Sequence, residues 1–492
     1  MCAASRSVTS LLPRVRAIAL LGGIVCALWL GSAQAVSAHA ILLHTEPPDQ
    51  CTALQSPRLP TRDPRCDTGV VLASPPTAVQ LWFSEAPQPI GNGITVTSPT
   101  GARVATGSVR VEGAQMRVPV TGIAPDATGT YTVTWEVIAA DTHPERGGFA
   151  FSIGEPSVGV VHPDRSGDSP LTGGLAAASI ARWLHFLGYA LGFGPLAFAV
   201  FVLHPLSRAT RHRTSGKDTQ RQVRRLVQGG IALLLIAEPS ALVGQLLSLG
   251  AGGGSAEVNG RFVGDVLASS FGRVLAQRVG AAVLLWVLLG VLDATDADTS
   301  EDTKATTETN SDGTSIITRV ALAVGIALAV ADGEASHAGN NGGGVTWLGY
   351  LANTAHVAAM GLWLGGLVTL IVLWRLLDET ERATTLRRFG RAAGGALVVL
   401  IVSGSVMAVL HLSRPADLFT SAYGRALVAK LMLLLDALLL AWAGRAGRAG
   451  WAGTRIRRDN PVYRMRWWLL EGAAITGVLI FAALLVSLPP PP

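Results

Sequence analysis

Three residues of this chain have side chains that could together hold an oxidised copper ion. Asp141 and His143 stand two positions apart in the stretch from Ala140 to Pro144. In an extended segment, residues two apart face the same side, so this carboxylate and imidazole would converge. His39 would add its backbone amine and a second imidazole if it became the first residue of the mature chain. Such nitrogen and oxygen donors suit Cu(II) in a tetragonal arrangement, and the alternative is a solvated turn without metal.

The contribution of His39 depends on where the N-terminal segment is cut. Residues 1–38 have the basic start, short apolar stretch and small residues of a secretory signal. Cleavage after Ala35 and cleavage after Ala38 compete, and only the second exposes His39. Since all the proposed ligands bind metal when deprotonated, we expect the affinity to fall at low pH.

Two cysteines follow the signal segment. Cys51 and Cys66 flank a loop rich in Pro, Arg and Asp, in a region that we expect to be exported. Disulfides persist in such compartments, so we predict one disulfide that closes this loop. A copper site with cysteine ligands is the alternative.

The elements that must position the first three residues are short strands. From 130 to 138 apolar residues alternate with polar ones, which predicts a strand with one buried face. Further strands are predicted at 79–83, 94–97, 103–111 and 116–120, separated by Gly, Pro and Asp. Several short strands within residues 39–154 predict an all-β sandwich.

The rest of the chain has the composition of a membrane protein. Charged residues make up 15% of the whole sequence, against about 25% in soluble proteins. After a linker at 155–175, apolar stretches near the roughly 20 residues that cross a bilayer recur. They lie at 178–203, 226–249, 274–293, 316–332, 346–374, 392–412, 425–444 and 467–488. We predict an all-α polytopic membrane domain of about eight transmembrane helices over 176–492, with the acidic segment 294–315 as a disordered loop.

Basic residues predict the orientation of this domain. They gather in the segments 208–225, 375–391 and 445–466, which all fall on one side if the spans alternate. The positive-inside rule makes that side cytoplasmic, so the β-domain and both ends are predicted to lie outside the cytoplasmic (plasma) membrane. The net charge of +6 belongs to these loops and does not indicate a nucleic-acid partner.

Histidines and methionines near the outer ends of the apolar spans are candidates for a second copper site, because polar groups at membrane depth are functional candidates. Imidazole with thioether suits Cu(I), and imidazole alone suits Cu(II). His356 and Met360 are four residues apart and share a helix face, a spacing repeated further along the chain. The candidates are His337, His356, Met360, Met407 and His411, with His185 as a further member.

Each of these candidates also has a structural reading. Methionine on an apolar helix usually fills the core. His411 could cap its helix end, and His337 could be solvated beside the polar turn that precedes it. Glu238-Pro239 is predicted to break the second span, so its carboxylate is either a polar relay or part of a bend.

Four stretches of the β-domain resemble the CopC family of copper-binding proteins. They are 39–47, 79–85, 135–143 and 148–154, so that the resemblance covers residues 39–154. It implies a cupredoxin-like or immunoglobulin-like sandwich with Cu(II) ligands at His39, Asp141 and His143. The loop with Cys51 and Cys66 departs from the family. Met116 stands alone, so we expect no separate Cu(I) site in this domain.

The helical part resembles the CopD family of copper-handling membrane proteins. The matching stretches are 336–338, 356–367 and 423–430, together with Glu471. This resemblance implies copper uptake or tolerance rather than an enzymatic reaction. The implied partners are copper ions and the lipid bilayer, with extracytoplasmic copper chaperones or reductases as further ones. A copper-dependent oxidative enzyme and a haem- or copper-based membrane electron-transfer protein stay open as alternatives.

Overall fold

The computed structural model describes most of the chain. The described residues are Ala40 and residues 42–49, 69–139, 142–157, 173–203, 214–250, 259–301, 307–334, 346–412, 414–449 and 461–487. The signal segment, His39, Cys51, Cys66, Asp141, His337 and most of the linker lie outside them, so the predictions made for those residues stay predictions.

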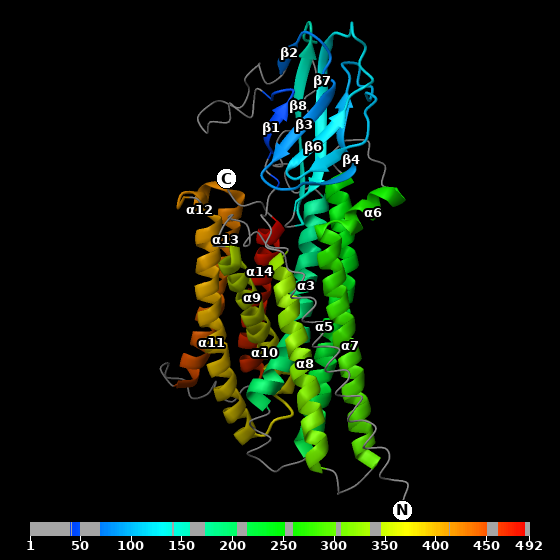
Figure 1. Ribbon diagram of the computed structural model, residues 1–492. Coiled ribbons are helices and arrows are strands. Elements are labelled where there is room, and N and C mark those ends of the chain that lie inside the picture. The colour runs from blue at the N-terminus through cyan, green and yellow to red at the C-terminus, as the bar shows by residue number, and fades with distance from the viewer. Residues whose placement is uncertain are drawn as a thin grey trace, which may run out of the picture.

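The molecule has a β-domain on one end of a long helical bundle (Figure 1). Within the described part of this domain, eight strands form two four-stranded sheets, in the orders β1-β3-β6-β5 and β2-β8-β7-β4. Neighbours are antiparallel except for β2, which runs parallel to β8. The strands are β1 (Leu42–Glu46), β2 (Val70–Leu72), β3 (Ala78–Phe83), β4 (Gln88–Thr97), β5 (Arg110–Glu112), β6 (Gln115–Pro119), β7 (Gly129–Ile138) and β8 (Pro144–Ile153).

The predicted alternation in β7 is confirmed. Val133 and Val137 are fully buried, and Tyr131 and Trp135 are at most 7% exposed. They pack in one core with apolar side chains of the other sheet, among them Leu81 of β3. The core therefore lies between the two sheets, as in a β-sandwich.

The expected strand at 103–111 is wrong as one continuous element. Arg103 forms an isolated bridge to Thr97 at the end of β4, whereas Thr106 bridges to Val120 just after β6. These two partners belong to different sheets. The segment therefore crosses from one sheet to the other, and regular pairing resumes only in β5.

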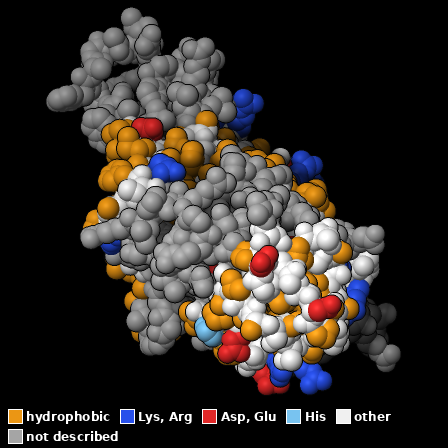
Figure 2. Space-filling model, turned by 90° about the horizontal axis from the view of Figure 1, so that it is seen from above, with side chains coloured by type: hydrophobic (Ala, Val, Ile, Leu, Met, Phe, Trp, Pro, Cys, Tyr) orange, Lys and Arg blue, Asp and Glu red, His pale blue; other side chains and the backbone are white. Residues whose placement is uncertain are grey.

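The β-domain presents a mixed surface away from the helices. Seen from above, charged side chains on its described part are scattered among polar and apolar ones and form no single patch (Figure 2). Its core is its own, but one end contacts the bundle through an apolar cluster. This cluster joins Ile90, Ile138, Leu249, Phe262 and Val266.

Each expected apolar stretch falls on a helix. The helices are α3 (Gly173–Phe198) with the π-helical turn η2 (Ala199–Leu203), α5 (Thr214–Gly250), α6 (Gly260–Ala268), α7 (Ser270–Glu301), α8 (Thr307–Glu334), α9 (Thr346–Met360) with the π-helical turn η4 (Gly361–Gly365) and α10 (Gly366–Leu373), α11 (Glu379–His411), α12 (Asp417–Thr420), α13 (Ala422–Ala449) and α14 (Pro461–Ser487). Five helices of the described part are long and apolar enough to cross a membrane. The count of about eight spans stays a prediction.

Two predictions about the bundle are wrong. Helix α5 continues through Glu238-Pro239 rather than breaking there. The acidic segment 294–315 is not a loop throughout, because α7 runs to Glu301 and α8 begins at Thr307. A proline removes one backbone donor, which a membrane helix tolerates when neighbouring groups bind the freed carbonyls.

Helix α3 packs closely against η4. A Cβ on Gly365 would lie 1.9 Å from the carbonyl oxygen of Ala190, and one on Gly194 would lie 2.4 Å from that of Gly361. Small residues at these positions let the two backbones touch. This contact fixes α9 beside α3.

Candidate functional site

The proposed copper ligand His143 follows a tight turn between β7 and β8. The amide of Ala139 donates to the carbonyl of His143 at 2.9 Å, and the amide of Thr142 donates back to Ala139 at 3.0 Å. Thr142 has a φ of 74°, in the left-handed region that non-glycine residues seldom adopt. Thr142 therefore departs from the extended backbone that the sequence predicts here, and strand alternation does not set the direction of the His143 side chain.

His143 contacts the membrane domain directly. Its Nε2 lies 3.0 Å from the carbonyl oxygen of Val486 in the last turn of α14. The same nitrogen lies 3.3 Å from the guanidinium of Arg182 on α3. A protonated Nε2 donates to the carbonyl, whereas an unprotonated one accepts from the arginine. The side chain is buried, at 8% exposure.

Further hydrogen bonds hold the β7–β8 turn on the bundle. Gln245 of α5 donates to the carbonyl of Thr142 at 3.0 Å. The hydroxyl of Ser270, the first residue of α7, donates to the carbonyl of Ala139 at 2.8 Å. Helices α3, α5, α7 and α14 therefore all contact the turn that carries His143.

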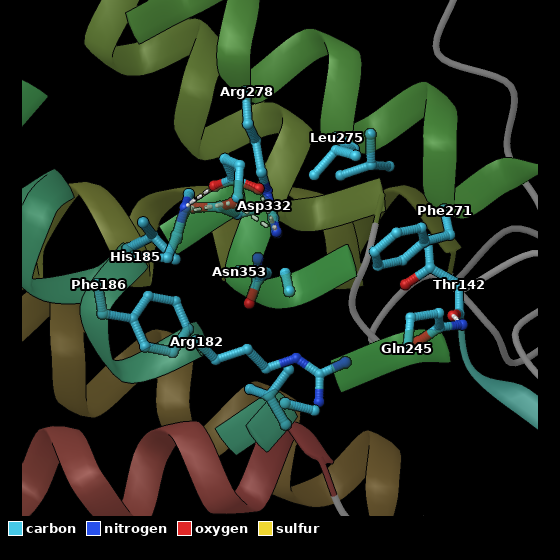
Figure 3. Close-up of a pocket in the computed structure, with 16 residues that line it drawn as sticks. Thr142, Arg182, His185, Phe186, Gln245, Phe271, Leu275, Arg278, Asp332 and Asn353 are labelled. Atoms are coloured by element: carbon cyan, nitrogen blue, oxygen red, sulfur yellow. Dashed lines mark hydrogen bonds and ion pairs between the residues drawn. The ribbon is translucent and has the colours of Figure 1, made fainter. Parts of the chain in front are cut away.

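A cavity of about 50 Å³, lined by both charged and apolar side chains, lies in the bundle directly below this turn. Figure 3 shows Thr142 and Gln245 at one end of this junction cavity and His185, Arg278 and Asp332 at the other. The volume is enough for a few water molecules. The junction cavity therefore connects the turn that carries His143 with charged side chains inside the helices.

These charged side chains form a buried quartet of His185, Glu238, Arg278 and Asp332. Nδ1 of His185 lies 2.6 Å from Glu238 Oε1, and Nε2 lies 3.0 Å from Asp332 Oδ1. Nη2 of Arg278 lies 2.9 Å from Asp332 Oδ1, and Nη1 lies 3.8 Å from Glu238 Oε2. His185, Glu238 and Asp332 are each at most 5% exposed.

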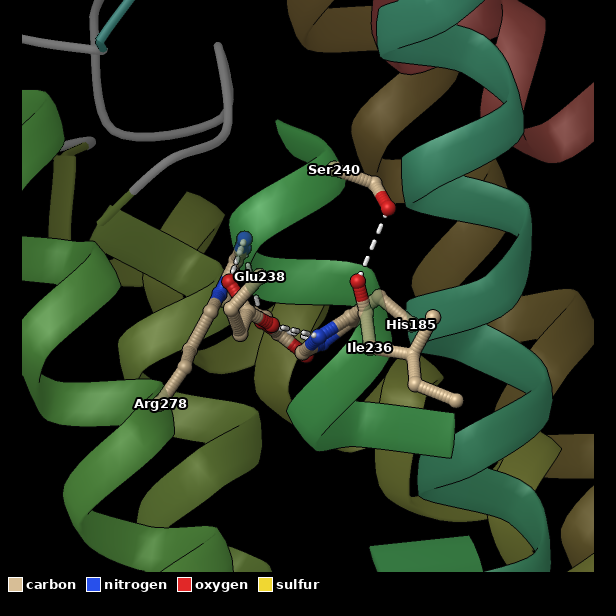
Figure 4. A network of polar contacts seen from close by, with 6 residues as sticks. His185, Ile236, Glu238, Ser240 and Arg278 are labelled. Carbon is tan, nitrogen blue, oxygen red and sulfur yellow. Dashed lines mark hydrogen bonds and ion pairs between the residues drawn. The ribbon is translucent and has the colours of Figure 1, made fainter. Parts of the chain in front are cut away.

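The quartet is assembled from four helices. His185 comes from α3, Glu238 from α5 and Arg278 from α7 (Figure 4), and Asp332 comes from α8 (Figure 3). Next to Glu238, the proline at 239 frees a carbonyl, and Ser240 donates its hydroxyl to Ile236 O at 2.8 Å.

The side chain of His356 contacts α11, whereas that of His185 contacts α5 and α8. Its Nδ1 lies 3.0 Å from the hydroxyl of Ser403 on α11. A Cβ on Gly404 would lie 3.3 Å from the ring, so a small residue makes room for it. Met360, four residues later, packs against apolar clusters of the bundle. In the structure this methionine therefore fills the core.

His411 lies at the C-terminal end of α11, as expected for a residue at a helix end. Its Nδ1 lies 2.9 Å from the hydroxyl of Tyr423 on α13. Met407 lies one turn before it on the same helix. Within the described residues, the structure therefore gives His185, His356 and His411 separate polar partners. A shared copper site for the membrane candidates stays a prediction.

The sequence reasoning missed Arg182, Arg278 and Asp332 as members of the site. Each is a charged residue on a predicted apolar span, which marks a functional candidate by itself. His185 and Glu238 were noticed for that reason, but as separate features. The signal that could have joined them is charge balance, because two acids and two bases on four spans can neutralise one another.

Three family models match the chain. "CopC domain" matches residues 63–154, "Copper resistance protein D-like, N-terminal domain" matches 173–343, and "Copper resistance protein D" matches 383–487. Asp141 and His143 fall in the first match, and the whole quartet falls in the second. His39 and His356 lie outside all three ranges.

Similar proteins are copper proteins by name. The "Copper transport protein CutJ" of Bacillus subtilis (strain 168) is 26% identical over 426 residues, which cover 86% of this chain and 72% of the relative. The crystal structure of CopC from Methylosinus trichosporium OB3b matches 25% of this chain and all of its own, at 18% identity and a TM-score of 0.18. PcoC from Escherichia coli, a methionine-rich copper resistance protein, matches 24% of this chain and all of its own, at 23% identity and a TM-score of 0.17. The names describe copper transport and resistance rather than an enzyme.

Proposed function

This chain combines CopC and CopD domains in one polypeptide, and on that premise we propose that it binds Cu(II) outside the cytoplasmic membrane and passes copper into the membrane domain. The ligands would be His143, Asp141 and His39, with the amine of His39 exposed by signal cleavage. The junction cavity would receive the copper. Extracytoplasmic chaperones or reductases would supply it.

The contact between His143 and Val486 carries this proposal. A histidine that binds a metal usually donates its other ring N–H to a carbonyl or a carboxylate, which fixes the tautomer. With its proton on Nε2, His143 donates to Val486 O at 3.0 Å and has its lone pair on Nδ1. The ligand would therefore be oriented by the membrane domain itself.

The positive charge of Arg182 would control the release of copper from the β-domain. Its guanidinium lies 3.3 Å from His143 and 2.6 Å from the hydroxyl of Ser487, at the outer end of the junction cavity. A cation leaving the β-domain must pass this positive charge. Arg182 therefore favours retention of copper in the β-domain until the arginine moves or the net charge of the quartet changes.

The ends of the bundle support an outward-facing β-domain. Ser179, near the start of α3, lies 3.2 Å from Ser487 at the end of α14. The two ends of the membrane domain therefore lie on the same side, which an even number of crossings requires. The arginine-rich start of α11 lies at the opposite end of the bundle (Figure 1), where the positive-inside rule places the cytoplasm.

Copper titration of the intact protein tests the proposed ligand. Purified protein is titrated with Cu(II) against a competing chelator, with N-terminal sequencing to establish whether His39 comes first. We expect His143→Ala to weaken Cu(II) binding by at least about tenfold, since even lost second-shell partners of metal sites cost 10- to 100-fold.

His44→Ala is the matched control, because His44 belongs to the same domain but lies exposed against Trp82, with ring centroids 5.0 Å apart. Unchanged affinity after His143→Ala would refute the ligand assignment. A mature chain that begins before His39 and binds equally tightly would remove the amine from the site. Copper accumulation in cells carrying each variant then distinguishes uptake from tolerance.

A further inference from the structure

Both ring nitrogens of His185 face carboxylates. Nδ1 is 2.6 Å from Glu238, and Nε2 is 3.0 and 3.1 Å from the two oxygens of Asp332. A carboxylate accepts hydrogen bonds, so each nitrogen needs a proton to make its contact. In this geometry His185 is therefore an imidazolium, which carries a positive charge.

The groups around His185 balance this charge. Glu238 of α5 and Asp332 of α8 contribute two negative charges, and Arg278 of α7 contributes a second positive one. The quartet is thus neutral when His185 carries both protons and has a net charge of −1 when one proton leaves. The other groups on the cavity wall are Arg182 one turn earlier on α3, Gln245 of α5, Asn353 of α9 and the Thr142 turn.

Unpaired polar atoms next to the quartet point to water. The hydroxyl of Tyr189, one turn after His185 on α3, is buried and has no hydrogen-bond partner among the described residues. The same is true of the side-chain nitrogen of Asn353, which lines the cavity. Buried polar atoms are nearly always paired with protein or water, so the junction cavity offers a place where water would satisfy the Asn353 nitrogen.

A purely structural role would not need this arrangement. Moving charges out of water costs several kcal/mol per ion, and apolar side chains of similar size often serve stability as well or better. Here each of four helices contributes one charged side chain to a cavity that begins at the copper-ligand turn. Ionisable groups kept at such cost in membrane proteins commonly serve ion and proton pathways.

We propose that His185 releases one proton for each copper ion that enters the junction cavity, so that the chain is a copper–proton exchanger. This inference rests on the proposed function. The N–H bond of the imidazolium breaks, and the proton passes to a carboxylate or water and then to the side of the membrane from which the copper arrives, while the copper continues to the other side. The quartet is left with one negative charge, which attracts the incoming cation past Arg182.

Flux measurements on the intact protein in liposomes test this exchange. Copper is added outside as CuSO4, with and without ascorbate, while the membrane potential is held at zero with potassium and valinomycin. Copper inside is measured by mass spectrometry, and pH by a trapped dye. With one proton exchanged per ion, an interior one pH unit more acidic should raise the equilibrium copper ratio about tenfold.

Copper accumulation that ignores the pH gradient would overturn the exchange and leave the proposed function standing. Absence of protein-dependent copper flux under both redox conditions would overturn the proposed function and this inference with it. These wild-type measurements do not depend on the folding of any variant.

The variant His185→Gln tests whether the exchanged proton comes from this residue. Glutamine keeps polar contacts but cannot release a proton in this range, so the pH effect should fall from about tenfold to none. His44→Gln, on the exposed surface of the β-domain, should behave as wild type. A pH effect that persists in folded His185→Gln protein, as judged by gel filtration, would assign the exchange elsewhere.

Discussion

Replacement of Asp332 by Asn should destabilise the membrane domain strongly, because it removes a charge and almost no volume. Asp332 Oδ1 lies 2.9 Å from Arg278 and 3.0 Å from His185, and the carboxylate side chain is 3% exposed. The substitution takes the quartet from zero net charge to +1. Breaking a buried ion pair by removing one partner costs about 3–5 kcal/mol, and we expect a loss in that range.

A second substitution turns this expectation into a test of coupling. Arg278→Gln in the same chain returns the net charge of the quartet to zero. If the two groups act as a pair, the double variant should recover about 1–3 kcal/mol relative to the sum of the two single losses. Independent contributions would instead add.

Equilibrium unfolding of the purified protein in mixed micelles, followed by circular dichroism, measures these differences. Arg414→Gln is the control, since its ion pair with Asp417 spans 3.4 Å and the arginine side chain is 68% exposed. Such a surface pair should contribute no more than about 1 kcal/mol. A loss below about 1 kcal/mol for Asp332→Asn, or strict additivity with Arg278→Gln, would refute the charge balance that we assign to the quartet.

Two further predictions concern packing and pH. Gly365→Ala should lower the free energy of unfolding by at least about 1–3 kcal/mol in the same assay, because its Cβ would lie 1.9 Å from Ala190 O. Gly280→Ala on α7 is the control, since its Cβ would meet nothing within 4 Å, and it should be neutral or stabilising. Desolvation raises the pKa of the Glu136 carboxyl, partly offset by the charge of Arg146 opposite it on β8. The folded state therefore binds the Glu136 proton more tightly than the unfolded state does. The stabilisation that comes from this proton is complete below the unfolded pKa of about 4.3 and is lost as the pH rises through the pKa of the folded state. Glu136→Gln should therefore protect the β7 amides from hydrogen exchange more than wild type at pH 7 and equally at pH 4; the same difference at both values would contradict this.

Much of the β-domain could be predicted because one face of each strand is buried. Val133, Trp135 and Val137 follow one another at intervals of two residues, and their burial follows from the period of a strand. The segment at 103–111 has similar composition but pairs with both sheets in turn, and local pattern contains no information about which sheet a residue reaches. Thr142 shows the same limit, because its positive φ reflects the closure of the hairpin and not the preference of a threonine.

The helices were predictable from length and hydropathy, whereas their interior chemistry was not. Glu238-Pro239 looked like a helix break because local rules for proline assume water around the chain. In the bundle, the helix continues, and Glu238 meets His185 and Arg278 from other helices. A sequence shows that such charges are rare in apolar spans, but only packing shows which of them face one another.

The contact between His143 and Val486 has a consequence for how the protein matures. These residues are 343 positions apart, so the imidazole emerges from the ribosome long before the carbonyl that orients it. During synthesis the β-domain can fold around its own core, yet the turn that carries His143 gains its contact with Val486 only when α14 has been made. If His143 is the copper ligand that we propose, copper loading should therefore require the complete polypeptide.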